Sequence, residues 1–144
     1  MIVQIAFYKG KTRLFNRLVS WYLRGQYSHC ELIFGYAEAT FGTVAICASS
    51  SFMDGGVRVK TIQLHPDRWD IVEVGGDYES ANKWLIAHEG DGYDILGLLG
   101  FIWRRTPDSQ RRWFCNEAVA AMLGHVDPWR FDPCSMAARF GLQP

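Results

Sequence analysis

What the chain lacks excludes several classes of protein at once. It has no net charge, because 15 lysine and arginine residues balance 15 aspartate and glutamate residues, and nucleic acid is therefore not expected as its main partner. The longest apolar run near the middle of the chain, from Ile95 to Trp103, is too short to span a bilayer. We therefore expect neither a nucleic-acid partner nor a transmembrane segment.

The chain also lacks the signals of a secreted protein. Its four cysteines show no close pairing and do not resemble a disulfide framework. The first residues carry neither a basic segment nor a small-residue cleavage site, so no signal peptide is expected. The default location is the reducing cytoplasm, and a protein delivered by another route, as in a phage particle, would show the same signals. The sequence predicts no oligomeric state.

What is present predicts a single globular domain over residues 1–144, because 49% of the residues are hydrophobic and the chain is long enough to bury a core. We expect strands at Ile2–Tyr8, Ser28–Phe34, Val44–Ser49, Val57–Leu64 and Trp69–Val74. We expect helices at Thr12–Leu23 (closed by Gly25), Glu79–His88, Tyr93–Trp103, Cys115 to Gly124, and Pro133–Phe140 with Asp132 as its cap. This order predicts an α+β fold.

Cys115 stands where one of these helices should begin. The positive end of the helix dipole lowers the pKa of a thiol and favours the thiolate, which is the nucleophilic form. The alternative is a buried cysteine that serves only as a small hydrophobic residue.

His29 is the candidate partner of Cys115, and it lies in a segment with strand composition. A helix start with a cysteine beside a strand with a histidine is the arrangement that a cysteine hydrolase needs. The next residue, Cys30, is expected to face the opposite side of the strand.

Four segments in order resemble one family. They are Gly10 to Phe34, Asp54-Gly55-Gly56-Val57, Gly92-Tyr93-Asp94 and Phe114-Cys115-Asn116-Glu117-Ala118-Val119. Together they are similar to the circularly permuted papain-like amidohydrolases, which include the YiiX-like branch of the NlpC superfamily and the relatives of lecithin–retinol acyltransferase. The resemblance implies an antiparallel sheet or small β-barrel packed against the helix that carries the nucleophilic cysteine.

The group that would orient the histidine departs from the family pattern. A histidine base needs an acceptor on its second ring nitrogen, and the resemblance places that acceptor at Cys47, a poor one. Glu31 lies two residues after His29 and shares its strand face, so Glu31 either orients the imidazole or points to solvent. Ser49 is the second candidate for the orienting role.

Two further groups are candidates for substrate binding. The resemblance places Tyr93 near the nucleophile, where its hydroxyl could stabilise an oxyanion; the alternative is a tyrosine that packs its ring in the core. Arginines bracket the loop before Cys115, at Arg104, Arg105, Arg111 and Arg112. Arg111 and Arg112 either bind a carboxylate-bearing substrate or form a solvated face.

These observations predict a cysteine hydrolase that uses no cofactor and no metal, since no Cys-x-x-Cys or His-x-x-x-His pair is present. Its expected substrates are peptides, amides or acyl compounds, and the resemblance favours amides of peptidoglycan stem peptides. A lipid or thioester acyl hydrolase or acyltransferase is the first alternative. An inactive binding module on the same fold is the second.

Overall fold

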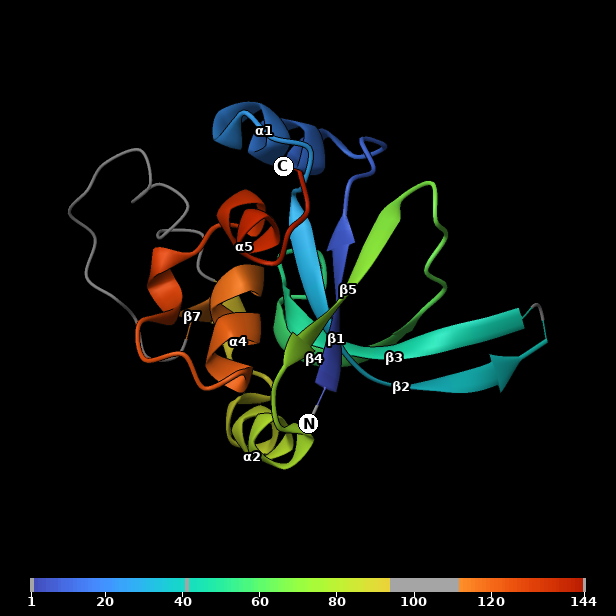
Figure 1. Ribbon diagram of the computed structural model, residues 1–144, viewed down its shortest axis with the longest axis vertical. Helices are drawn as coiled ribbons and strands as arrows, with labels where there is room; N and C mark the ends of the chain where they lie inside the picture. Colours follow the sequence, from blue (N-terminus) through green and yellow to red (C-terminus); the bar gives the residue numbers. More distant parts are fainter. Residues whose placement is uncertain (1, 41, 94–111, 144) are drawn as a thin grey trace.

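The computed structural model describes residues 2–40, 42–93 and 112–143. The described residues form a curled mixed sheet, shaped like half a barrel, with helices against it (Figure 1). The seven strands run in the spatial order β5-β1-β2-β3-β4-β6-β7. Their bounds are β1 Ile2–Tyr8, β2 His29–Ala39, β3 Gly42–Ser51, β4 Gly56–Ile62, β5 Trp69–Gly75, β6 Gly92–Tyr93 and β7 Arg112–Trp113. The coarse prediction of an α+β fold is therefore confirmed.

Antiparallel pairing joins the first five strands and β6, whereas β6 and β7 pair in parallel. The sheet is thus mixed, not wholly antiparallel as expected. The glycines at the start of β4 make the β6 contact feasible, because Gly56 has a φ of +145° and a Cβ there would collide with the carbonyl of Asp91. This close approach fixes Tyr93 beside the start of β4.

The helices are α1 Leu14–Leu23, α2 Tyr78–His88, α4 Cys115–Met122, the short 3-10 helix η1 Pro128–Arg130 and α5 Pro133–Arg139. Helix α4 packs against β2 and β3 on one face of the sheet, with α2, η1 and α5 around it (Figure 1). This packing sets the first turn of α4 beside the first residues of β2, although the two segments are far apart in sequence.

Local sequence explains where most of these helices begin and end. The carboxylate of Asp132 accepts the backbone N–H groups of Cys134 and Ser135, so the predicted cap of α5 is confirmed. The predicted end of α1 at Leu23 is confirmed, but the helix begins at Leu14 and not at Thr12. The residue that closes it in the left-handed conformation is Arg24, with φ +53° and ψ +34°, and not the predicted Gly25. A helix was predicted over Tyr93–Trp103, but Tyr93 belongs to strand β6. The other residues of that prediction lie outside the described ranges.

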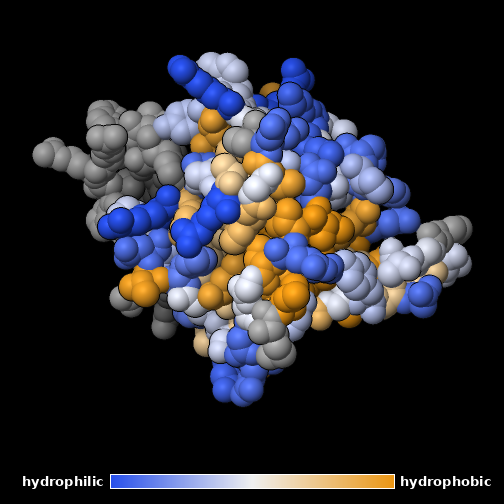
Figure 2. Space-filling view, in the orientation of Figure 1, coloured by the Kyte–Doolittle hydropathy of each residue, from blue (hydrophilic) through white to orange (hydrophobic). Residues whose placement is uncertain are grey.

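Side chains alternate between two buried clusters on the faces of the sheet. The larger cluster lies under α4 and includes Cys30 and Leu32, while Ile33 and Cys47 belong to a smaller cluster on the other face. Figure 2 shows hydrophobic side chains near the middle of one face of the molecule and hydrophilic ones around its rim. Among the described helices, none is long and apolar enough to cross a membrane.

Candidate active site

Cys115 is the first residue of α4 and is only 4% exposed. Phe114 precedes it in an extended conformation, and the carboxylate of Glu117 accepts the Phe114 N–H at 3.0 Å. This cap satisfies one donor of the first turn and holds the helix start in place. The backbone N–H of Cys115 itself has no acceptor in a preceding helical turn, so both the thiol and a backbone donor lie at the positive end of the helix.

His29 opens β2, and its Nε2 atom lies 2.6 Å from Glu31 Oε1. Residues two apart on a strand share a face, and this geometry explains the contact. Glu31 is fully buried, so the alternative in which it points to solvent is wrong. Ser49 does not contact the imidazole through its hydroxyl, which donates to the carbonyl of Cys30 at 2.7 Å.

A buried carboxylate needs compensating partners, and besides His29 the charged partner of Glu31 is Arg58 of β4. Arg58 Nη1 lies 2.7 Å from Glu31 Oε2, and Arg58 Nη2 lies 2.6 Å from Glu31 Oε1. Asp54 Oδ2 accepts from Arg58 Nε at 2.9 Å, and Lys60 binds the other oxygen of Asp54 at 2.8 Å. The result is a line of alternating charges that runs from His29 to the protein surface, and it fixes the Glu31 carboxylate in one orientation.

The electrostatics of Cys115 and His29 favour a thiolate–imidazolium pair. Burial by itself lowers the pKa of His29, but the charges of Cys115 and Glu31 and hydrogen bonds to both outweigh burial and raise that pKa to about 10. A hydrogen bond from the Cys30 thiol, the charge of His29 and a hydrogen bond to His29 hold the pKa of Cys115 well below its usual range, against the effect of burial. The structure therefore brings Cys115, His29 and Glu31 into one site.

Cys30 is a neighbour of Cys115 that the sequence interpretation treated only as a buried residue. It faces away from Glu31, as its place in the strand predicts, and packs under α4 in the same cluster as Cys115. Burial, followed by its hydrogen bond to Cys115, raises the pKa of the Cys30 thiol well above its usual range. Cys30 therefore stays a neutral donor beside a thiol that ionises easily.

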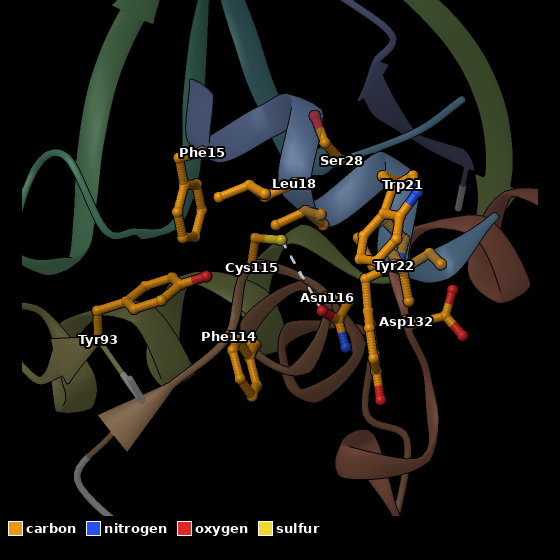
Figure 3. Close-up of a pocket in the computed structure, with 13 residues that line it drawn as sticks. Phe15, Leu18, Trp21, Tyr22, Ser28, Tyr93, Phe114, Cys115, Asn116 and Asp132 are labelled. Atoms are coloured by element: carbon orange, nitrogen blue, oxygen red, sulfur yellow. Dashed lines mark hydrogen bonds between the residues drawn. The ribbon is translucent and has the colours of Figure 1, made fainter. Parts of the chain in front are cut away.

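An apolar pocket of about 260 Å³ opens at Cys115. Helix α1 supplies six of its lining residues, which are Phe15, Leu18, Val19, Trp21, Tyr22 and Leu23. Figure 3 shows α1 over Cys115, with Leu18 between the helix and the thiol, Phe15 to one side and Trp21 and Tyr22 to the other. Asn116 also lines the pocket, with Oδ1 3.8 Å from the Cys115 sulfur and its side-chain amide donating to the carbonyl of Phe131. The pocket suits an apolar group attached to a carbonyl near Cys115.

A second, more polar cleft of about 500 Å³ lies on the His29 side and is also lined by Glu31 and Arg58. Phe15, Ser28 and Tyr93 line both hollows. The Ser28 hydroxyl is buried and has no hydrogen-bond partner among the described residues. The site therefore has an apolar side and a polar side, with a buried hydroxyl between them.

The structure places Tyr93 at this junction, where its ring packs edge-on against Phe114 with centroids 5.5 Å apart. Figure 3 shows its hydroxyl directed towards the Cys115 side of the pocket. Arg112 is exposed on β7 and lines neither hollow, so the structure does not bring it to the thiol. Arg104, Arg105 and Arg111 lie outside the described residues.

Arg58 is the member of the site that sequence reasoning missed. An available signal was the charge of Arg58 directly after a buried residue of β4, Val57, and close after the turn that carries Asp54. Within the described ranges, no group of three histidine, cysteine or acidic residues could hold a metal ion. No protein-family model and no curated protein matches the chain.

Proposed function

We propose that this protein is a cysteine hydrolase that works through an acyl-enzyme, on a permuted papain-like fold in which the histidine strand precedes the cysteine helix. The observation that carries this function is the imidazole of His29, which meets the Glu31 carboxylate on Nε2 and lies close enough to Cys115 for the two groups to shift each other's pKa. A nucleophile, its base and an orienting carboxylate together are the requirements of covalent acyl transfer.

In the first step the Cys115 thiolate attacks the substrate carbonyl, and the carbonyl π electrons move to its oxygen. When that tetrahedral intermediate collapses, the carbon–leaving-group bond breaks and the leaving group takes a proton from the His29 imidazolium. The product is a thioester on Cys115. Neutral His29 then removes a proton from water, the resulting hydroxide attacks the thioester, and the Cys115 thiolate leaves. This step releases the acid product and regenerates the ion pair of the Cys115 thiolate and the His29 imidazolium.

Two groups near the Cys115 thiol support a site for the oxyanion. The backbone N–H of Cys115 is one, because it is the first N–H of α4. The Tyr93 hydroxyl is the other, since the Tyr93 ring lines the Cys115 pocket and Figure 3 shows its oxygen on that side. Donors at a developing oxyanion lower the barrier of acyl transfer more than they stabilise the bound substrate.

The lining of the pocket supports an apolar acyl group in preference to a peptidoglycan stem peptide. Stem peptides are polar and charged, whereas the pocket at Cys115 is built from α1 side chains such as Leu18, Val19 and Tyr22. The polar cleft beside His29 suits the leaving group and the attacking water. Among the amide, ester and thioester substrates, we therefore favour those with an apolar acyl chain.

A chain-length series tests this function. The purified protein is incubated with p-nitrophenyl acetate, butyrate and octanoate, and separately with a stem peptide, and intact mass spectrometry follows the adduct on Cys115. We expect kcat/KM to rise with chain length and the acyl adduct to appear on Cys115. Cys115→Ala should abolish both signals. The matched control is Cys134→Ser, which keeps a donor for the carbonyl of Tyr27 and should leave both unchanged.

Other outcomes separate the alternatives. Cleavage of the stem peptide without any preference for longer esters would favour the amidase over the acyl hydrolase. Tight binding of acyl compounds, with no adduct and no turnover at any pH, would favour the binding module and would overturn the enzymatic function.

A further inference from the structure

Helix α1 exposes an apolar stripe that its own chain leaves uncovered among the described residues. Only Ser20 of its ten residues is buried, while Leu14 is 71% exposed, Leu18 54% and Trp21 78%. These three positions lie on one side of the helix. Single exposed hydrophobic residues are ordinary, but a continuous stripe of large ones marks a surface that binds something.

Basic side chains border this stripe. A groove of about 1070 Å³ on the outer side of α1 is lined by Leu14, Leu18 and Trp21 together with Lys11, Arg17 and Arg24. Over the described ranges, none of these three cations pairs with an acidic side chain. The surface therefore combines an apolar centre with a positive rim.

The charge of this region stands out in a chain that is neutral as a whole. Residues 1–30 contain five basic residues and no acidic residue, so residues 31–144 hold the other 10 basic and all 15 acidic residues. An anionic partner is the one that such a surface attracts over a distance. A short helix with large apolar side chains on one face and arginine or lysine beside them is typical of segments that lie in a membrane interface.

We propose that α1 docks the protein on the surface of an anionic phospholipid bilayer, with Leu14, Leu18 and Trp21 in the interface and Lys11, Arg17 and Arg24 on lipid headgroups. Two other occupants fit the charges less well. A second copy of the chain would bring two basic stripes together in a symmetric contact. Residues 94–111 contain three arginines and two aspartates, so they do not complement a basic rim.

The position of α1 connects this surface with the active site. Leu18, Trp21 and Tyr22 line both the outer groove and the apolar pocket at Cys115. The wall between the lipid surface and the pocket is therefore only one layer of side chains thick. A docked α1 sets the pocket beside the acyl chains of the bilayer; this consequence, unlike the docking itself, rests on the proposed function.

Vesicle flotation tests the docking without catalysis, because it can use the Cys115→Ala protein. We expect flotation with vesicles of phosphatidylcholine and phosphatidylglycerol, little with phosphatidylcholine alone, and loss of binding at high salt. Lys11→Glu and Arg17→Glu should each lower the partition coefficient by at least about fivefold, the contribution of one basic residue near an anionic surface. Leu14→Ser should also lower the partition coefficient, because the variant loses a large apolar side chain from the interface.

Trp129→Ala is the matched control, because Trp129 is also exposed but lies on η1, away from α1; flotation should not change. Equal flotation of the α1 variants and the control would overturn the docking, and so would a dimer in sedimentation analysis that Leu14→Ser converts to monomer. Normal flotation with no ester hydrolysis by the wild type would leave the docking standing and refute the enzymatic function.

Discussion

His29 Nε2 and Glu31 Oε1 lie 2.6 Å apart in a site where the carboxylate is fully buried. The burial of Glu31 is costly unless the charge is compensated, and here Arg58 holds both carboxylate oxygens while one of them also meets His29. The carboxylate therefore keeps the imidazole in one orientation and leaves the Nδ1 side of the ring for Cys115. It also favours the imidazolium form that the thiolate needs.

Glu31→Gln should lower the pKa of His29 from about 10, because the neutral amide no longer stabilises the imidazolium. Loss of the comparable carboxylate costs ~10⁴ in kcat in the serine proteases, and we expect a loss of up to that order here. Ester hydrolysis and an NMR titration of His29 measure the two effects. Glu38→Gln, an exposed carboxylate on the same strand, should change neither. Full activity of Glu31→Gln together with an inactive Ser49→Ala would assign the orienting role to Ser49.

Arg58→Met should destabilise the fold, because it leaves Glu31 with only His29 as a charged partner. Breaking a buried pair on one side costs about 3–5 kcal/mol, to be measured by urea unfolding. The pKa of Glu31 is lowered in the folded protein, so its contribution to stability is present above the unfolded value of 4.5 and is lost as the pH falls through the folded value. The deficit of the variant should therefore be full at neutral pH and should shrink in acid.

Lys60→Met is the control for this variant, since its side chain is half exposed and pairs only with Asp54 among the described residues. It should cost less than about 1 kcal/mol. Adding Glu31→Leu to Arg58→Met should recover most of the lost stability, because no uncompensated charge then remains. An Arg58→Met protein as stable as the wild type at neutral pH would contradict the role of Arg58 as the partner of Glu31.

Ser28→Ala separates stability from activity. The Ser28 hydroxyl is buried without a partner among the described residues, and a buried unpaired hydroxyl costs roughly 1–3 kcal/mol. Its removal should leave the free energy of unfolding unchanged or raise it. If the hydroxyl binds the substrate between the two hollows, kcat/KM should fall at the same time. A variant that is both less stable and fully active would show that Ser28 has a structural partner and no part in the reaction.

Patterns within single segments predicted much of this fold. The start of α4 at Cys115, the shared face of His29 and Glu31, and the Asp132 cap of α5 all follow from spacing along the chain. These features depend on neighbours within four residues, so sequence alone contains the information. The left-handed conformation of Arg24 is an exception. Glycine adopts that conformation more easily than arginine, so Gly25 was predicted to close α1.

The features that sequence reasoning missed depend on contacts between distant segments. Glu31 lies on β2 and Arg58 on β4, and only β3 lies between these two strands in the sheet, so the Arg58 side chain can reach Glu31. No local sequence pattern predicts that strand order. The two-residue strands β6 and β7 could not be predicted from local patterns either, since they form only because Gly92 pairs with Arg112, twenty positions later in the chain. Exposure of the α1 stripe also depends on what the rest of the chain covers.

The most direct test of the central claim is the rate at which iodoacetamide labels Cys115 as a function of pH, read peptide by peptide for all four cysteines. The pair of Cys115 and His29 predicts that Cys115 reacts fastest at pH ~6 and changes little up to pH ~8, since its thiol is already ionised. In His29→Ala the rate should be low at the acid end and rise about tenfold per pH unit towards an ordinary thiol pKa of ~8.5. Equal rates for the four thiols, or a His29→Ala profile identical to the wild type, would contradict a thiolate–imidazolium pair and with it the proposed hydrolase.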